Sequence, residues 1–283
     1  MEIVAQHDPD TGTITYVVID PATSCCAVID SVLDYDPRAA RTTTVGAEKL
    51  LALVKDRGLT CQWLLETHVH ADHLSGAAWL KPRIGGQVAI GNQITPVQKV
   101  FAEIFDLDGF PADGRQFDHL FADGEEFVVG NLRARTLHTP GHTPACMTYV
   151  IEDAAFVGDT LFMPDSGSAR CDFPGGDARI LFHSIRRILD LPPTTRVFTA
   201  HDYGAGGRAP AWESTVGEQR ASNIHVRDGI SEDQFVAMRT ARDATLGMPT
   251  LILPSLQVNI RAGEMPEPDA HGKRFFKLPL NRL

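Results

Sequence analysis

The sequence places three histidines and one aspartate within six residues, in the run HVHADH at positions 68–73. Side chains two residues apart in an extended segment point to the same side, so His68 and His70 can face one point. A helix predicted to begin at Asp72 would turn Asp72 and His73 towards a neighbouring point. Imidazole nitrogens combined with carboxylate oxygens suit zinc, iron or manganese, whereas calcium prefers oxygens alone. The run therefore predicts a transition-metal site rather than a solvated histidine-rich turn.

Three further segments carry residues of the same types. His142 lies in HTPGHT, where Gly141 allows the backbone to pass close to a site. Asp159 follows an apolar strand in VGDT, where a carboxylate is costly unless it is paired or binds a metal. His201 lies in TAHDYG, again at a predicted strand end. Each segment alone is typical of an ordinary loop, but together with HVHADH they predict one metal cluster.

Each of these motifs follows a predicted strand, which is where a rigid scaffold carries functional loops. Apolar or alternating runs predict strands at 13–20, 25–35, 62–68, 87–92 and 195–204, and hairpins at 125–139 and 147–162. Helical spacing of apolar residues predicts helices at 46–59, 72–85, 94–107, 178–191 and 234–246. About the last 35 residues are rich in proline and polar groups and are expected to be coil.

The order of these elements favours an α+β fold with two antiparallel-rich sheets covered by helices. With 283 residues and 43% hydrophobic content, the chain can bury a sizeable core. We expect one domain spanning residues 1–283, with a C-terminal extension at about 247–283.

Composition excludes several classes of function. The net charge of −10 repels phosphate backbones, so no nucleic-acid partner is expected. No stretch approaches the roughly 18 apolar residues of a membrane helix, and the N-terminus does not resemble a secretory signal. The five cysteines show no CxxC spacing and are expected to be reduced, mostly buried thiols. These observations predict a cytoplasmic protein without a membrane partner.

The other histidines have no partner ligand close in sequence or motif, so we do not expect them to bind metal. Four of them lie in loop-like or terminal segments and are expected to be solvated: His7, His119, His225 and His271. His138 is placed in a strand and His183 on a helix face.

The motifs together resemble the metallo-β-lactamase superfamily, and the resemblance covers nearly the whole chain. It implies a four-layer αββα sandwich with the metal at the edge of the sheets. The resemblance to the usual two-metal version implies two ligand sets that share a bridging residue. One ion would be bound by His68, His70 and His142, the other by Asp72, His73 and His201, with Asp159 between them.

Flanking segments narrow the resemblance to one branch. HTPGHTPACMTY, GDTLFMPDSGSARCDF and AHDYG resemble the persulfide dioxygenase branch, the ETHE1-like sulfur dioxygenases, from His68 to about Gly263. That branch implies a single ferrous iron, Fe(II), on His68, His142 and Asp159, a facial triad that leaves positions open for substrate and O2. The remaining cluster residues would then hold ligands and waters by hydrogen bonds: His70, Asp72, His73 and His201.

The resemblance also implies a substrate, glutathione persulfide, which is oxidised with O2 to sulfite and glutathione. Glutathione carries two carboxylates, so arginines are expected in its site. Arg170 and Arg261 match arginines of the family, and Tyr203 could donate a hydrogen bond. Members of the branch often have cysteine where this chain has Ser168. Homodimers are common in the branch, so a homodimer is a further partner to consider.

Two other functions fit the same residues. A glyoxalase II-like enzyme, or another thioester or lactone hydrolase, would use two zinc ions, and every ligand that it needs is present. Glyoxalase II usually has a second histidine shortly after the PGHT segment, where this chain has Cys146, and a longer helical C-terminal domain. A non-catalytic scaffold is the other alternative, and the intact ligand set argues against it.

Overall fold

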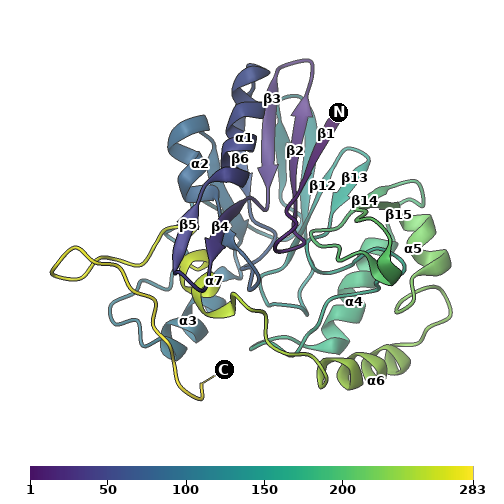
Figure 1. The fold of residues 1–283 in the computed structure, drawn as a ribbon. Coiled ribbons are helices and arrows are strands. Elements are labelled where there is room, and N and C mark those ends of the chain that lie inside the picture. The colour runs from purple at the N-terminus through teal and green to yellow at the C-terminus, as the bar shows by residue number, and fades with distance from the viewer. Residues whose placement is uncertain (283) are drawn as a thin grey trace.

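Two six-stranded sheets form the centre of the structure, a computed structural model that describes residues 1–282 (Figure 1). The first sheet has the order β1 (Glu2–His7), β2 (Ile14–Asp20), β3 (Cys25–Ile29), β6 (Thr60–Leu65), β8 (Gln87–Gly91) and β9 (His119–Phe121). The second has the order β10 (Glu126–Val129), β11 (Leu132–His138), β12 (Met147–Ile151), β13 (Ala154–Phe156), β14 (Arg196–Phe198) and β15 (Glu213–Thr215). A smaller sheet contains β5 (Arg41–Thr43), β4 (Val32–Asp36) and β7 (Leu74–Ser75).

Helices cover the outer faces of both large sheets. The first sheet packs against α1 (Val45–Asp56), α2 (Ala77–Ile84) and α3 (Ile94–Ile104). The second packs against α4 (Ala178–Leu189), α5 (Val216–Ser222) and α6 (Glu232–Asp243), and a short 3-10 turn lies at Ala205–Gly207. The expected αββα sandwich is therefore confirmed.

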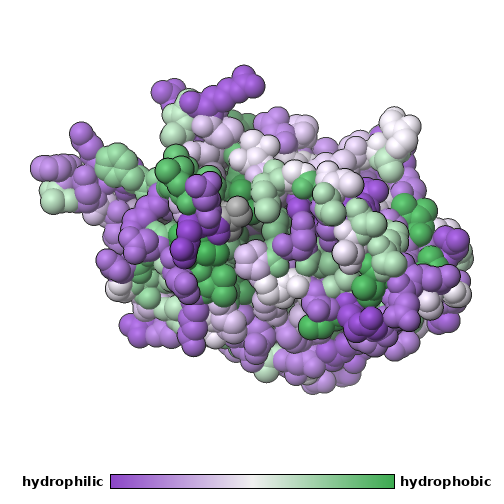
Figure 2. All heavy atoms as spheres, turned by 90° about the horizontal axis from the view of Figure 1, so that it is seen from below, coloured by the Kyte–Doolittle hydropathy of each residue, from purple (hydrophilic) through white to green (hydrophobic). Residues whose placement is uncertain are grey.

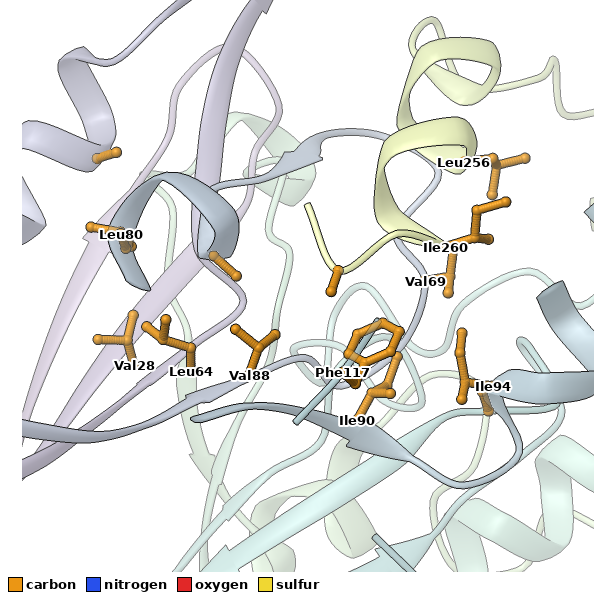
Figure 3. Packing of buried hydrophobic residues seen from close by; sticks show 14 of the residues in the cluster. Val28, Leu64, Val69, Leu80, Val88, Ile90, Ile94, Phe117, Leu256 and Ile260 are labelled. Carbon is orange, nitrogen blue, oxygen red and sulfur yellow. The ribbon is translucent and has the colours of Figure 1, made fainter. Parts of the chain in front are cut away.

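Strand β2 shows why these layers form. Ile14, Tyr16 and Val18 face the core between the two sheets, whereas Val17 and Ile19 face the layer of helices. Successive side chains of a strand point to opposite faces, and all seven residues of β2 are buried, so this strand is covered on both sides. In the helical layer, Figure 3 shows Leu80 of α2 above Val28 and Leu64 of the first sheet.

The sequence predicted most elements of the sandwich. Both predicted hairpins are present, and they turn between Val129 and Leu132 and between Ile151 and Ala154. All five cysteines are free and four of them are buried, as expected for reduced thiols. No helix within residues 1–282 is both long and apolar enough to cross a membrane.

Three local predictions were wrong. The segment 25–35 is not one strand, because the chain turns at Asp30, which has a φ of 52° and separates β3 from β4. The helix predicted at 72–85 begins only at Ala77, so Asp72 lies in a loop that leads into the short strand β7. The N-terminal strand β1 was not predicted; it pairs with β2 along its whole length.

The C-terminal segment is not coil throughout, because it contains helix α7 (Ile252–Asn259). Leu256 of α7 and the following Ile260 are buried in the same core cluster as Val69 of the histidine run (Figure 3). The last residue of the helix, Asn259, is 4% exposed. Its side-chain amide donates to the carbonyls of His70 and His73 and its oxygen accepts from the Ser75 N–H, each at 2.8 Å. The helix therefore fixes the backbone of the histidine run.

Replacing this amide should loosen the loop. Asn259→Ala leaves a buried N–H and two buried carbonyls without their partner, so we expect the free energy of unfolding to fall by about 3 kcal/mol. Denaturant titration at fixed metal content measures this change. The exposed Asn92→Ala is the matched control, and its effect should stay within about 0.5 kcal/mol. Equal unfolding midpoints for the two variants would contradict the role of Asn259.

Candidate metal centre

The strand ends bring all seven predicted cluster residues to one edge of the sandwich. The histidine run follows β6, His142 lies between β11 and β12, Asp159 follows β13, and His201 follows β14. Six of the seven are at most 8% exposed, and Asp72 is partly exposed. These residues form three overlapping groups, and within each group the ligand atoms lie within 4.8 Å of one another. The groups are His68, His142 and Asp159; His70, Asp72 and His73; and Asp72, Asp159 and His201.

In the first group, two imidazoles approach one carboxylate. The Nε2 atoms of His68 and His142 lie 3.9 and 3.8 Å from Oδ2 of Asp159. Burial lowers the pKa of His68 well below its ordinary value and also lowers the pKa of His142. Both rings are therefore neutral at neutral pH, which is the form that binds a metal.

Hydrogen bonds fix which nitrogen of each ring faces the carboxylate. His142 donates from Nδ1 to the backbone carbonyl of Arg170 at 2.7 Å, so its Nε2 carries the lone pair. The hydroxyl of Thr67 donates to Asp30 at 2.8 Å and lies 3.0 Å from Nδ1 of His68. Because that hydroxyl proton is engaged, His68 must donate from Nδ1, and its Nε2 also carries the lone pair. Two lone pairs and a carboxylate oxygen thus converge.

His201 has a different environment. Its Nδ1 lies 2.5 Å from Asp159 and its Nε2 lies 2.6 Å from Asp72, so both nitrogens have a carboxylate partner. Burial opposes a charge on this ring, but Asp159 and Asp72 outweigh burial and raise the pKa of His201 well above its ordinary value. His73 contacts Asp72 and the Thr13 hydroxyl through Nδ1, both at 3.3 Å.

Two buried carboxylates that the sequence analysis missed surround His70. Its Nε2 lies 3.0 Å from Asp30 and 3.5 Å from Glu66. Burial disfavours the charged ring, yet these carboxylates raise the pKa of His70 to about 10. Asp30 also accepts the backbone N–H and the hydroxyl of Thr67. The signal was present in the sequence, since Asp30 ends an apolar strand just as Asp159 does.

These donors fit a metal ion. Within residues 1–282, three buried imidazole nitrogens of the cluster have no hydrogen-bond partner: His68 Nε2, His70 Nδ1 and His73 Nε2. A buried polar atom without a partner is costly, and a bound cation removes that cost. Nitrogen donors combined with carboxylates suit zinc or iron and do not suit calcium.

A cavity of about 1060 Å³ opens onto this cluster, reaching Asp72, His73, His142 and Asp159. Its rim includes exposed hydrophobic side chains, among them Ile224 and Leu246. Seen from below, hydrophobic residues reach the surface among hydrophilic ones (Figure 2). Such a mixed lining suits a small organic substrate that has both apolar and polar parts.

Of the three predicted substrate-binding residues, two line the cavity and the third does not. Arg170 lines the cavity, but its guanidinium already donates to both oxygens of Asp172, at 2.6 and 2.7 Å. Tyr203 lines the cavity, is 72% exposed, and stacks on His201 with ring centroids 6.0 Å apart. Arg261 packs over the ring of Phe110 and is not part of the cavity lining within residues 1–282.

One of the other histidines was wrongly predicted to be solvated. His225 is 5% exposed, and its Nδ1 accepts the backbone N–H of Ser168 at 3.0 Å. Burial lowers the pKa of His225 to about 4, helped by the charges of Arg239 and Arg242. It therefore supports the loop that follows Asp159 as a neutral acceptor.

The Asp30 carboxylate should tune the metal site without touching it. Asp30→Asn keeps the size of the side chain and tolerates the left-handed backbone at this position, but removes the charge beside His70. We expect metal affinity to fall roughly 10–100-fold, as measured by competition with a chelator. The exposed Asp56→Asn is the control. Unchanged affinity in the Asp30 variant would show that the charge has no influence on the centre.

Sequence comparison places the chain among proteins with hydrolase-like names. It is 55% identical to a probable metallo-hydrolase of Burkholderia pseudomallei over the whole of both chains. It is 55% identical to a β-lactamase hydrolase-like protein of Xylella fastidiosa, covering 98% of this chain but only 64% of that protein. It is 49% identical to glyoxylase B2 of Dictyostelium discoideum, over 100% of this chain and 97% of that one.

Persulfide dioxygenases are more distant relatives. The human mitochondrial persulfide dioxygenase ETHE1 is 30% identical over 90% of this chain and 86% of its own length. The crystal structure of ETHE1 from Myxococcus xanthus superposes with a TM-score of 0.74 at 28% identity, covering 93% of this chain and 100% of that chain.

The family comparison agrees with the geometry. The model of the metallo-beta-lactamase superfamily matches residues 8–201, which include every residue of the metal cluster. The sandwich, the strand-end position of the ligands and the sequence match lead to one assignment: the chain belongs to the metallo-β-lactamase superfamily of metal-dependent enzymes.

Proposed function

We propose that this protein is a mononuclear Fe(II) persulfide dioxygenase that oxidises glutathione persulfide with O2 to sulfite and glutathione. The iron ligands would be His68, His142 and Asp159. One observation carries the proposal: hydrogen bonding leaves the Nε2 lone pairs of both histidines facing Asp159, whereas His201 has carboxylates on both nitrogens. That division favours one three-ligand site over two equivalent sites.

The comparisons support the same reaction. Human ETHE1 bears the name persulfide dioxygenase and aligns with most of this chain. The Myxococcus ETHE1 structure superposes on this chain over the whole of the Myxococcus protein. Iron held by two imidazoles and one carboxylate supplies open positions where a persulfide and O2 can meet. Each turnover consumes one persulfide, one O2 and one water, and it yields glutathione, sulfite and two protons.

The residues around the site bind and orient the substrate in this proposal. Tyr203 stands at the cavity beside His201 and could donate a hydrogen bond to the substrate. Arg170 contributes twice, because its carbonyl holds His142 and its side chain forms part of the wall. His201 holds Asp159 in place through the hydrogen bond between its Nδ1 and Oδ1 of Asp159. Asp72 in turn holds the ring of His201 at Nε2. We leave Arg261 out of the substrate site, since it packs on Phe110.

A thioester or lactone hydrolase with two zinc ions is the second candidate. Its support is specific: Nδ1 of His70 and Nε2 of His73 have no hydrogen-bond partner within residues 1–282 and could face metal ions. The names of the relatives at 49–55% identity also point towards hydrolysis. The same cluster would then activate water for attack on a carbonyl.

Metal content and oxygen consumption distinguish these candidates. Protein purified without air should contain about one iron per chain and little zinc, and it should consume O2 when glutathione persulfide is added. Elemental analysis and an oxygen electrode measure the two quantities. Two zinc ions per chain, with hydrolysis of S-lactoylglutathione and no oxygen uptake, would reject the dioxygenase in favour of the hydrolase.

Single substitutions test the roles within the cluster. His142→Ala should abolish iron binding, because a three-ligand site loses one of its nitrogen donors. His201→Ala should retain iron and lower kcat roughly 10–100-fold, since it removes only a group that orients Asp159. Iron per chain and kcat are measured on the same preparation, with the exposed His271→Ala as control. Loss of half the bound metal in the His201 variant would instead support a two-metal centre.

A further inference from the structure

Acidic and basic side chains in the cavity lining come from different segments of the chain, and we call these two parts of the lining its walls. One wall comes from the loop between β1 and β2 and from β4, and it contributes Asp8, Asp10, Asp34 and Asp36. None of these carboxylates forms an ion pair within residues 1–282; Asp8, Asp34 and Asp36 accept hydrogen bonds from backbone N–H groups. The other wall comes from α6 and the loop after Asp159, and it carries arginines.

Two of the three arginines on that wall are already paired. Arg170 is held by Asp172. Arg239 is 1% exposed, lies 2.5 Å from Asp243, and donates to the carbonyl of Ser168 at 2.9 Å. Their charges are therefore largely compensated.

Arg242 differs from both. It lies three residues after Arg239 on α6, it is exposed, and it lines the cavity. Within residues 1–282 its guanidinium has neither an ion pair nor a hydrogen bond. Its positive charge helps to lower the pKa of the buried His225. Arg242 is thus an uncompensated cation facing the cavity.

We propose that Arg242 anchors a carboxylate of the substrate, and that the cavity selects a zwitterionic, peptide-like thiol rather than a neutral one. The proposal rests on the function proposed above and extends it. The protein has a net charge of −10, so an anionic substrate needs a local cation. The planar guanidinium matches a carboxylate with two parallel hydrogen bonds. The acidic wall repels carboxylates and attracts an ammonium group, which orients the molecule.

Arg170 contributes to this anchor by holding the chain next to it. Its third nitrogen donates to the carbonyl of Gly247 at 2.6 Å, in the segment that follows α6. Leu246 and Gly247 line the same cavity as Arg242. Arg170 is therefore a positioning residue for this wall, and Arg242 is the group that meets the carboxylate.

Binding of an unreactive analogue tests the anchor. Titration calorimetry with S-methylglutathione, on the full metal-loaded chain, should show a Kd about tenfold or more higher for Arg242→Gln than for the native protein. The control Arg135→Gln removes an exposed arginine on β11, outside the cavity lining, and should leave Kd unchanged. The diethyl ester of S-methylglutathione should bind both Arg242 forms equally, because it has no carboxylate.

The acidic wall has its own probe. Asp10→Asn should weaken binding of S-methylglutathione but not of its N-acetyl derivative, which lacks the ammonium group. The ammonium role is wrong if both ligands lose affinity equally or if neither does. The carboxylate role is wrong if Arg242→Gln binds S-methylglutathione as tightly as the native protein does. It is also wrong if the variant loses as much affinity for the diethyl ester as for S-methylglutathione.

The outcomes separate this inference from the proposed reaction, because S-methylglutathione is not consumed. Binding that depends on Arg242 without any oxygen uptake would refute the dioxygenase and keep the anchor. If the protein consumes O2 with glutathione persulfide and Arg242→Gln leaves the KM for this substrate unchanged, the dioxygenase is kept and the anchor is refuted. A native protein that does not bind S-methylglutathione refutes the anchor as well.

Discussion

Asp30 holds a carboxylate at a point that is 2% exposed, and three donors surround it: the backbone N–H and hydroxyl of Thr67, and Nε2 of His70. A buried charge is tolerated only with such partners. The arrangement then determines the chemistry nearby. Because the hydroxyl of Thr67 is turned towards Asp30, His68 must donate to that hydroxyl and present its other nitrogen to the metal side. One charge at the end of β3 thus selects the tautomer of His68, a ligand that follows the neighbouring strand β6.

The second half of the centre is built on the same principle with different parts. The backbone carbonyl of Arg170 selects the tautomer of His142. The loop that contains Arg170 is itself held by hydrogen bonds. Asp243 accepts the N–H of Cys171, and His225 accepts that of Ser168, so α6 and its neighbours hold the loop by its backbone. The orientation of the metal ligands therefore depends on the position of backbone N–H and carbonyl groups. The side chains of the residues that supply these groups matter little for this purpose.

This dependence explains what the sequence could and could not predict. The residue types and spacing in HVHADH, together with the strand-end positions of His142, Asp159 and His201, were sufficient to identify the cluster. Asp30 and Asn259 were missed because their partners lie far away in the chain, although the position of Asp30 after an apolar strand was a signal. Glu66 lies only four residues before His70, but the sequence does not show that both side chains are buried. His225 was misplaced for the same reason, since its burial comes from the loop that it supports. Helix α2 began late because the short strand β7 takes the residues before it.

The contact of Asn259 with the histidine run has a consequence for the order of events in the cell. Its amide reaches carbonyls that lie 186 and 189 positions earlier in the chain. The ribosome releases those positions long before it makes α7, so a nascent chain displays the histidines without the clamp that shapes their loop. The hydrogen bonds that shape the histidine loop are therefore complete only after α7 has been synthesised. A truncated translation product would carry the ligands and still lack the enclosure that holds them to one geometry.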